Sequence, residues 1–509
     1  MGFLTSRNPN NEPARAEISE EALNDLMLRS YLDRIFDLNE TASRFDWTRF
    51  FTSDPEDLLY RRQVLSDLLN HPDLVNAISD VCKCLAQISS VQDMPASGEF
   101  YAESIREFSV LHLAHATMTK LMNLLDDMKS RNEITSGALI QLGEVIEEKV
   151  RTSFTADFDR TFRELAGGLE QLGSMKIRFT LDGEMHTQGA AITHIQKERF
   201  VGSLFGHNPI KELRQKEKPW DLSSLKEMKT PAEELIRVQL GANIKAFFQS
   251  ALKIWQDLAF LYDDLMFYLG ALRYIRQMKM LNLPLTYPTP LPASEKSFRA
   301  IELYNPILAV FKKAKTVPND ITFQPGGELF ILTGINQGGK TTFLRSVGTA
   351  QALFQLGWPI PCKEASISPV SGIVTVFSHE ENTNLQHGKL GQELKTFRAG
   401  LDRMKPDALL LCNEPITGTS PMENLYLSRE ILSACKLLGY HGIWVTHIYD
   451  LASGADEMNK ALSGSTISSL TAVALQKQDG VEASFVIKRG KPKFTSYAKE
   501  VLRRETGVF

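Results

Sequence analysis

The stretch Gly334–Thr341, GINQGGKT, decides the fold of the C-terminal half, because it has the spacing G-x-x-x-x-G-K-[ST] of a phosphate-binding loop. The apolar run Leu329–Leu332 before it predicts a strand, and Thr342–Arg345 after it begins a helical pattern. A strand, a glycine-rich loop and a helix in this order are typical of an α/β P-loop domain. Loop N–H groups and the helix N-terminus favour an anion here, so the sequence predicts a phosphate site.

Within this loop, each residue type has an expected task. Lys340 can reach the β- and γ-phosphates of a nucleotide, and the Thr341 hydroxyl can ligate Mg²⁺, so ATP and Mg²⁺ are the expected ligands. The predicted nucleotide-binding residues are Gly334, Asn336, Gln337, Gly338, Gly339, Lys340, Thr341 and Thr342.

A second buried-strand pattern, Asp407–Cys412, ends in Asn413 and Glu414, as a Walker B strand does. The usual aspartate, which orients the Mg²⁺ shell, is replaced by Asn413. An amide oxygen brings no charge, so we expect weaker Mg²⁺ binding, directly or through water. Glu414 is placed to act as general base for the attacking water.

A third strand pattern, Gly442–Val445, is followed by Thr446 and His447. A histidine at this place can contact the γ-phosphate and report its loss. Without the other motifs, the default interpretation of His447 would be an exposed histidine after a strand. With two phosphate motifs already present, the catalytic interpretation of His447 is favoured, beside Glu414 and Lys340.

Composition sets limits on the class of protein. The 509 residues carry a formal net charge of −4 with acidic and basic residues intermixed, so any DNA-binding surface must be local. Five scattered cysteines give no disulfide framework, and a zinc site at Cys82 and Cys84 is disfavoured. No run reaches the roughly 18 apolar residues of a membrane span, so a cytoplasmic or nucleoid-associated protein is expected.

From Ile18 to about Leu283 the pattern is mostly helical. Thr230–Glu233 has the spacing of a helix start, and no proline follows from Glu234 through Met278. This long helix fits either a mechanical lever or a plain core helix. Four prolines within Pro284–Pro292 then indicate a domain boundary, after which strands alternate with helices.

The helical pattern is interrupted over Phe179–Trp220, which contains four glycines and nearly balanced charges. Two interpretations stay open for this segment. It can be a tip that touches nucleic acid, or a solvated connector with a hairpin; the near cancellation of charge favours the connector.

These motifs resemble the ATPase domain of the MutS family of DNA mismatch-repair proteins, over residues 304–497. The stretches that carry the resemblance are Val317–Ile321, Thr333–Thr342, Asn413–Ser420 and Thr446–His447. More weakly, Arg61–Pro72 is similar to the opening of the family's core domain. The resemblance implies a helical core, levers, and an ATPase domain that dimerises so that each site is completed by its neighbour.

We therefore predict an all-α core and lever region followed by an α/β P-loop NTPase domain of the ABC/MutS type. The expected divisions are a polar tail over 1–17, a helical core over 18–229 with a short clamp remnant near 179–220, a lever helix over 230–283, a linker over 284–300 and the ATPase domain over 301–509.

Three positions depart from the family pattern. By spacing from Asn413, Gly388 stands where the family has the serine donated to the partner's γ-phosphate, with His387 and Lys389 beside it. Thr316 stands where the family offers an aromatic side chain to adenine. Together with Asn413, these residues predict slow hydrolysis. Core-like sequence begins near residue 20, so no mismatch-sensing domain is expected.

The leading hypothesis is an ATP·Mg-dependent dimeric switch that acts in DNA repair or recombination on branched or damaged DNA, with other repair proteins as partners. The alternative is a nucleotide-gated assembly module with little or no hydrolysis and no DNA binding.

Overall fold

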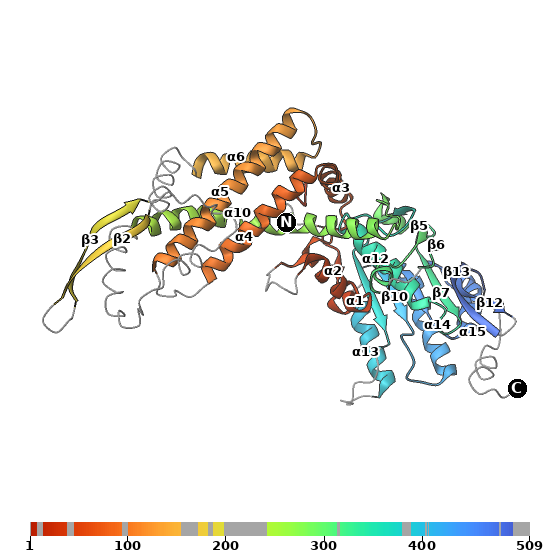
Figure 1. Cartoon of the computed structure of the whole chain (residues 1–509). Helices are drawn as coiled ribbons and strands as arrows, with labels where there is room; N and C mark the ends of the chain where they lie inside the picture. Colours follow the sequence, from red (N-terminus) through yellow and green to blue (C-terminus); the bar gives the residue numbers. More distant parts are fainter. Residues whose placement is uncertain are drawn as a thin grey trace. The chain divides into compact units, whose positions relative to one another are not determined.

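The computed structural model of the chain divides into two compact units, one formed by Met1–Asn70 with Met266–Phe509 and the other by His71–Leu265 (Figure 1). The structure describes residues 2–7, 14–37, 45–93, 100–153, 172–181, 187–197, 242–312, 316–378, 388–402, 405, 407–477 and 480–491.

The unit His71–Leu265 contains helices that pack through regular apolar stripes. Helix α4 packs along α5, and α5 packs against α6. Buried Leu74, Ile78, Val81 and Leu85 recur at helical intervals on α4, so one face of that helix is apolar. Cys82 and Cys84 are buried on the same helix. The helices are α4 (Pro72–Asp93), α5 (Phe100–Ser130), α6 (Gly137–Ser153) and the first part of α10 (Ala242–Met280).

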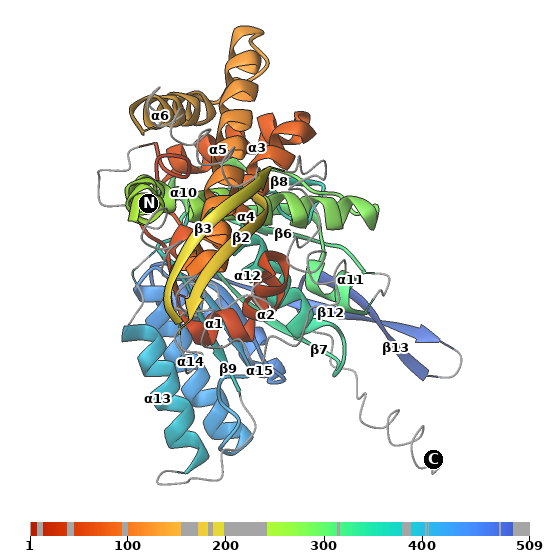
Figure 2. The same ribbon diagram turned by 60° about the vertical axis from the view of Figure 1, so that its left-hand side comes forward.

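The same unit contains an antiparallel hairpin of β2 (Leu172–Leu181) and β3 (Thr187–Lys197), drawn in yellow in Figure 2. The expected hairpin is therefore present, and it begins before Phe179. The prediction that the first half is all helical is not confirmed, because these two strands pair with one another. Residues 198–241, which include the predicted helix start at Thr230, lie outside the described residues.

Helix α10 is the long helix that the proline-free run predicts. Its 39 residues correspond to roughly 60 Å at 1.5 Å per residue. The boundary between the two compact units falls inside this helix, after Leu265. The lever role of α10 stays a prediction.

The larger unit is built on a seven-stranded sheet in the order β1-β9-β10-β11-β7-β12-β13. All neighbours are parallel except the long β12–β13 pair (Figure 2). The predicted α/β architecture of the C-terminal half is confirmed, and its sheet is mainly parallel. The strands are β1 (Glu17–Ile18), β7 (Glu328–Gly334), β9 (Gly372–Phe377), β10 (Leu409–Asn413), β11 (His441–Val445), β12 (Thr466–Lys477) and β13 (Gly480–Arg489).

Helices cover both faces of this sheet, as a parallel sheet requires. Leu410 and Cys412 of β10 join a core with Trp444 and residues of the four helices α13 to α16. Leu411, which alternates with them, contacts the opposite layer at Gly348 of α12. The helices are α12 (Lys340–Gln355), α13 (Lys389–Asp402), α14 (Pro421–Leu437), α15 (Tyr449–Ser453) and α16 (Ala455–Ala461).

A second sheet, in the order β4-β8-β5-β6, belongs to the same unit. It includes residues of the predicted linker 284–300, because Thr289 and Pro290 pair with β8 and Tyr304 donates a hydrogen bond to the Pro284 carbonyl at 2.9 Å. The elements are β4 (Thr289–Pro290), η4 (Ala293–Glu295), β5 (Phe298–Leu303), α11 (Pro306–Lys312), β6 (Asn319–Phe323) and β8 (Glu364–Ile367).

The N-terminal segment, residues 2–70, also belongs to the sheet-containing unit, which differs from the predicted division at residues 17 and 229. The reason is aromatic packing between residues far apart in sequence. Phe36 lies 5.8 Å from Trp358 and Phe50 lies 4.6 Å from Phe267, measured between ring centroids. The elements of the segment are β1, α1 (Glu20–Asp25), α2 (Leu28–Phe36), η1 (Trp47–Phe50) and α3 (Pro55–Asn70).

Across the described part of the chain, no helix is both long enough and apolar enough to cross a membrane.

Candidate nucleotide site

Three motifs meet at the carboxyl edge of the large sheet. Asn413 at the end of β10 is in register with Val445 of β11, and Val445 is in register with Leu332 of β7. All three strands are parallel, so the residues that follow them emerge at the same edge. The structure therefore brings together the loop after β7, Glu414 after β10 and His447 after β11.

The loop after β7 needs glycine at two places. Gly334 has φ +130°, and a Cβ there would lie 2.7 Å from the Ala472 side chain of β12. Gly339 has φ +86° and directly precedes α12. Between them, Asn336 and Gln337 are exposed, and Gly338 donates to the Ile335 carbonyl at 3.2 Å. The loop is thus a tight turn with its polar tip open to solvent.

Lys340 is folded over this loop. Its Nζ donates to the carbonyls of Gly334 and Ile335, each at 3.0 Å. Burial lowers the pKa of the Lys340 ammonium below its usual range, and the negative charge of Glu414 opposes that shift. A buried cation over a glycine loop is suited to bind an anion, whose oxygens would replace the loop carbonyls as acceptors. Thr342, in the first turn of α12, accepts a hydrogen bond from Ser346 at its carbonyl.

The two predicted Mg²⁺ residues are in contact. Thr341 Oγ1 donates to Asn413 Oδ1 at 3.1 Å, which joins the start of α12 to the end of β10. Both are neutral oxygen groups, a fit for Mg²⁺ only when phosphates and waters supply the remaining ligands. Among the described residues, no cluster of three or more His, Cys, Asp or Glu side chains is arranged to hold a metal ion.

Glu414 and His447 form a pair beside this contact. His447 Nε2 lies 2.7 Å from Glu414 Oε1, and both side chains are partly exposed. The hydrogen bond with His447 holds the pKa of the Glu414 carboxyl below its usual range, although burial acts in the opposite direction. Glu414 has φ +50°, a strained backbone for a non-glycine residue, and its N–H donates to the Val445 carbonyl. Strain of this kind is concentrated at functional sites.

One contact at the site was not predicted from the sequence. The Glu393 carboxylate of α13 accepts hydrogen bonds from the backbone N–H of Thr417 and from that of Gly418, the latter at 2.9 Å. A Cβ at Gly418 would lie 2.6 Å from the Leu390 N, so the loop after Glu414 is held against the start of α13. No spacing rule links Glu393 to a loop 24 residues later, so the sequence carries no signal for it.

Gly388 lies just before α13 and is exposed, with no atom within 4 Å of the position of a Cβ. Lys389 opens the helix. His387 lies outside the described residues. The position that the sequence assigns to the donated serine is therefore open to solvent and holds no side chain.

Phe485 of β13 is a site residue that the sequence analysis missed. Its side chain is 48% exposed, and its ring atom Cδ1 lies 3.3 Å from where a Gly339 Cβ would be. The Asn319 side chain makes two hydrogen bonds to the backbone of β13 at this place. Its amide donates to the Phe485 carbonyl at 3.1 Å, and its oxygen accepts from the Ile487 N–H at 2.6 Å. Phe485 has φ +57°. An exposed aromatic ring therefore lies against the glycine loop.

An open pocket of about 550 Å³ has Glu414 and His447 in its lining. Its wall is formed by the loop after Glu414, the start of α14 and the turn between β11 and α15. The lining includes Thr417, Met422, Trp444, Tyr449 and Asp450. The pair is therefore reachable from this pocket.

Comparison with known proteins gives two matching family models. Residues 53–281 match the model described as the MutS2 N-terminal domain, and residues 330–503 match that described as MutS domain V.

Curated relatives agree with these matches. The chain is 24% identical to the DNA mismatch repair protein MSH2 of Saccharomyces cerevisiae over 268 residues, which is 49% of this chain and 28% of the relative. It is 21% identical to a DNA mismatch repair protein MutS of Staphylococcus aureus over 435 residues, 84% of this chain and 46% of the relative. The chain thus spans less than half the length of these relatives.

Proposed function

Because this chain belongs to the MutS family, we propose that it is an ATP·Mg-dependent switch that slowly hydrolyses ATP to ADP and phosphate at the carboxyl edge of its large sheet. The observation that carries the proposal is the convergence of Lys340, the Thr341–Asn413 contact and the Glu414–His447 pair from three separate strands. Phosphoryl transfer depends mainly on positioning and charge stabilisation, which these groups supply.

Each group then has a role in the attack of water on the γ-phosphate. The loop N–H groups and Lys340 bind the phosphate oxygens and stabilise developing charge. Thr341 and Asn413 would hold Mg²⁺, and the ion would neutralise part of the phosphate charge. Glu414, held ionised by His447, orients the attacking water and accepts its proton. His447 then lies where it can respond to the loss of the γ-phosphate.

Slow turnover follows from three features of the site. Asn413 brings no negative charge to the metal, and the lowered pKa of Glu414 makes it a weaker base than an ordinary carboxylate. The open position at Gly388 supplies no serine to a second site. We further propose that two copies of the chain dimerise around bound nucleotide, so that occupancy of the site changes the geometry of the helical unit.

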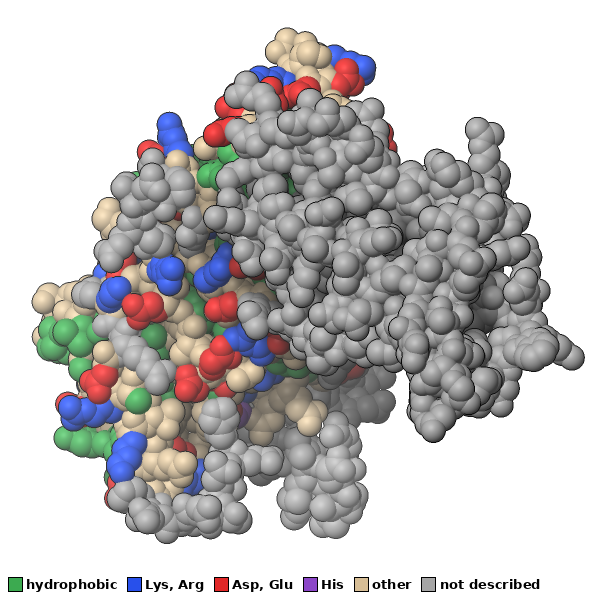
Figure 3. Space-filling view, turned by 90° about the vertical axis from the view of Figure 1, so that its left-hand side faces the viewer, with side chains coloured by type: hydrophobic (Ala, Val, Ile, Leu, Met, Phe, Trp, Pro, Cys, Tyr) green, Lys and Arg blue, Asp and Glu red, His purple; other side chains and the backbone are tan. Residues whose placement is uncertain are grey.

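Binding of branched or damaged DNA, and work with other repair proteins, are the finer parts of this proposal. They rest on the relatives, which are named as DNA mismatch repair proteins. Acidic and basic side chains of the described residues are interspersed on the face seen in Figure 3, so a DNA-binding surface there would be small. Retention on junction DNA that falls steeply with salt supports DNA binding, and salt-insensitive or absent retention contradicts it.

The second candidate is a nucleotide-gated assembly module in which ATP is a ligand and not a fuel. Asn413 and the missing serine at Gly388 favour it, because both weaken hydrolysis more than binding. The retained Glu414, held in a strained conformation beside His447, favours the ATPase.

Steady-state ATP hydrolysis, measured with and without branched DNA and at several protein concentrations, tests the two candidates. Lys340→Ala serves as the blank for contaminating ATPase. Turnover above this blank that rises with protein concentration supports a composite ATPase site, and stimulation by DNA supports a DNA-processing role. Nucleotide binding without turnover supports the assembly module, and absence of nucleotide binding contradicts both.

A further inference from the structure

The N-terminal segment lies directly against the helix that follows the phosphate loop. Strand β1 pairs with Gly372 and Ile373 of β9, at the edge of the sheet, and α1 packs beside it. A Cβ at Gly348 of α12 would lie 2.5 Å from Leu26, which follows α1. A Cβ at Gly372 would lie 2.5 Å from the Glu17 carbonyl. Only glycine at these two positions allows the segment to approach so closely.

Asp25, the last residue of α1, joins two elements of the nucleotide site. Its carboxylate accepts a hydrogen bond from Thr375 Oγ1 of β9 at 2.7 Å, and its backbone carbonyl accepts one from Arg345 Nε of α12 at 2.8 Å. The Arg345 guanidinium also lies over the Phe377 ring, 5.8 Å from its centroid. Asp25 is 7% exposed, so these bonds are shielded from water.

Both partners of Asp25 lie close in the chain to the Thr341–Asn413 contact. Arg345 is four residues after Thr341, one turn along the same face of α12. Thr375 is two residues before Phe377, which is in register with Asn413. Asp25 therefore fixes the spacing between α12 and the end of β9, the same two layers that Thr341 and Asn413 join at the site.

Helix α2 continues from α1 and contacts the C-terminal part of α10. Tyr31 Oη donates to Gln277 Oε1 at 3.0 Å, and Arg273 donates to the Ile35 carbonyl at 3.1 Å. A Cβ at Gly270 would overlap the Phe36 ring at 2.1 Å. One helix pair therefore contacts the phosphate-loop helix at one end and the last turns of α10 at the other.

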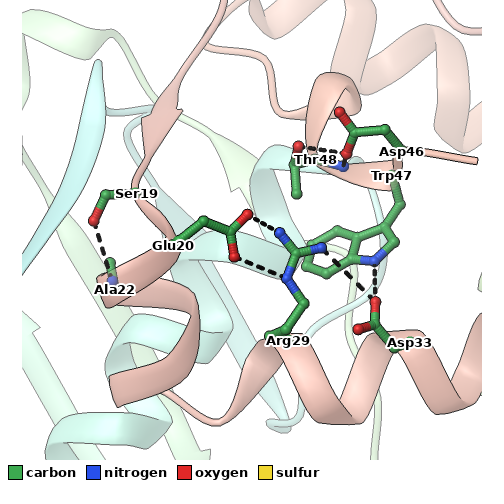
Figure 4. Close-up of polar contacts among 8 residues, drawn as sticks. All are labelled: Ser19, Glu20, Ala22, Arg29, Asp33, Asp46, Trp47 and Thr48. Carbon is green, nitrogen blue, oxygen red and sulfur yellow. Dashed lines mark hydrogen bonds and ion pairs between the residues drawn. The ribbon is translucent and has the colours of Figure 1, made fainter.

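Polar contacts connect α1 with α2 (Figure 4). Arg29 of α2 bonds to the Glu20 carboxylate of α1, with its Nε 3.0 Å from Oε2. The Arg29 guanidinium lies 4.8 Å from the Trp47 ring centroid, and the Trp47 indole donates to Asp33 Oδ1 at 2.7 Å. Because both helices share this cluster, we expect α1 and α2 to move together.

We propose that Asp25 is a positioning residue for the nucleotide site. In this proposal, α1 and α2 together transmit nucleotide-dependent changes in the position of α12 to α10. The proposal rests on the proposed function, since it requires that the site binds ATP. The proposal gives a role to α1 and α2, which contribute no residue to the phosphate loop, to β10 or to β11.

The test compares two threonine substitutions in the full-length chain. Thr375→Val removes the hydroxyl that donates to Asp25. Thr48→Val removes a hydroxyl that donates to the Asp46 carboxylate at 2.6 Å, in the same segment but away from α12, and is the matched control. For each protein, ATP·Mg binding, kcat and KM are measured, together with amide hydrogen exchange of residues 20–37 without nucleotide and with saturating ATP·Mg.

In the wild type, ATP is expected to change the exchange of residues 20–37. In Thr375→Val that response is lost and kcat falls about fivefold, while ATP affinity stays within about twofold of wild type. Thr48→Val keeps the wild-type values. Asp25→Ala is expected to lose the response of residues 20–37 to ATP. Asp25→Asn, whose amide oxygen can still accept from Thr375, is expected to keep most of that response.

Two results separate the proposals. If ATP binds to the wild type but exchange of residues 20–37 does not respond, or if Thr48→Val behaves like Thr375→Val, the positioning role is wrong and the proposed function stands. If the wild type binds no ATP, the proposed function fails and the positioning role fails with it.

Discussion

At the scale of single residues, Asn413 sets the chemistry of the metal position. Its Oδ1 accepts from Thr341 at 3.1 Å, and a carboxylate at the same place would accept the same bond while adding a negative charge. We expect Asn413→Asp to tighten Mg²⁺ binding roughly tenfold, because a charged oxygen holds a hard cation better than an amide oxygen, and to raise turnover. Mg²⁺ titration of ATP hydrolysis measures both, with Asn282→Asp, an exposed asparagine just after α10, as a control. Unchanged Mg²⁺ dependence and turnover would contradict the assigned role.

Glu414 gives a prediction for catalysis. Glu414→Gln keeps the size of the side chain but removes the base, so we expect turnover to fall by about 10²-fold or more while ATP binding persists. Single-turnover hydrolysis beside equilibrium binding of ATP separates the two effects. A variant that hydrolyses ATP at the wild-type rate would remove Glu414 from the mechanism.

The same carboxylate predicts a pH dependence of stability. His447 lowers the pKa of folded Glu414 below its unfolded value, so its stabilisation is present above the unfolded pKa and is lost as pH falls through the folded pKa. The side chain is 32% exposed, so solvent screening limits the effect to about 1 kcal/mol or less. Urea unfolding of wild type and Glu414→Gln at pH 7 and at pH 3.5 should show a difference that shrinks in acid. A difference that grows in acid would contradict this sign.

At the scale of elements, the β12–β13 pair places an aromatic ring at the phosphate loop. Phe485→Ala is expected to weaken ATP binding roughly tenfold, since an aromatic ring under a base contributes about 1–3 kcal/mol. Binding of inorganic tripolyphosphate, which has no base, should not change. Leu475→Ala, an equally exposed apolar residue on the neighbouring strand, is the control. Equal losses for ATP and tripolyphosphate would mean that Phe485 only supports the loop.

One buried side chain of α3 connects the N-terminal segment, to which α3 belongs, with the residue that follows α12. The Arg61 guanidinium is fully buried and donates to the carbonyls of Thr5, Phe50 and Leu356. Arg61→Met keeps the apolar stem but leaves these carbonyls without their donor, so we expect a loss of about 3 kcal/mol of unfolding free energy. Chemical denaturation measures it, with the adjacent exposed Arg62→Met as the control. A loss no larger than that of the control would contradict this role.

The elements also show what the sequence can predict and what it cannot. The strand, loop and helix around Lys340 follow from local spacing, because glycine torsions and apolar runs are properties of neighbouring residues. The roles of Asp25, Glu393 and Phe485 depend on contacts between distant segments. No periodicity in residues 2–70 indicates that they pack on Trp358, so the sequence pattern alone predicts that residues from 18 onward belong to a helical core.

At the scale of the whole molecule, the sheet-containing unit is assembled from two distant parts of the chain, 1–70 and 266–509. We expect a fragment of residues 266–509 alone to lack cooperative thermal unfolding, because Trp358 and Phe267 lose the aromatic partners Phe36 and Phe50. Joining residues 1–70 to this fragment through a flexible linker should restore a single transition. Cooperative unfolding of 266–509 by itself would contradict the division into these units.

The hydrogen bond from Arg61 to the Leu356 carbonyl closes a separation of 295 residues. During synthesis, residues 1–70 leave the ribosome long before residues 266–509, with which they form one unit. Residues 71–265 are made in between and can fold first. Pairings over such separations form slowly, because the entropy of closing a long loop is lost before any contact compensates for it. Aromatic side chains of the first segment, Trp47 among them, are meanwhile exposed to solvent. The nascent chain is therefore expected to depend on chaperones that shield residues 1–70 until the strands of residues 266–509 emerge.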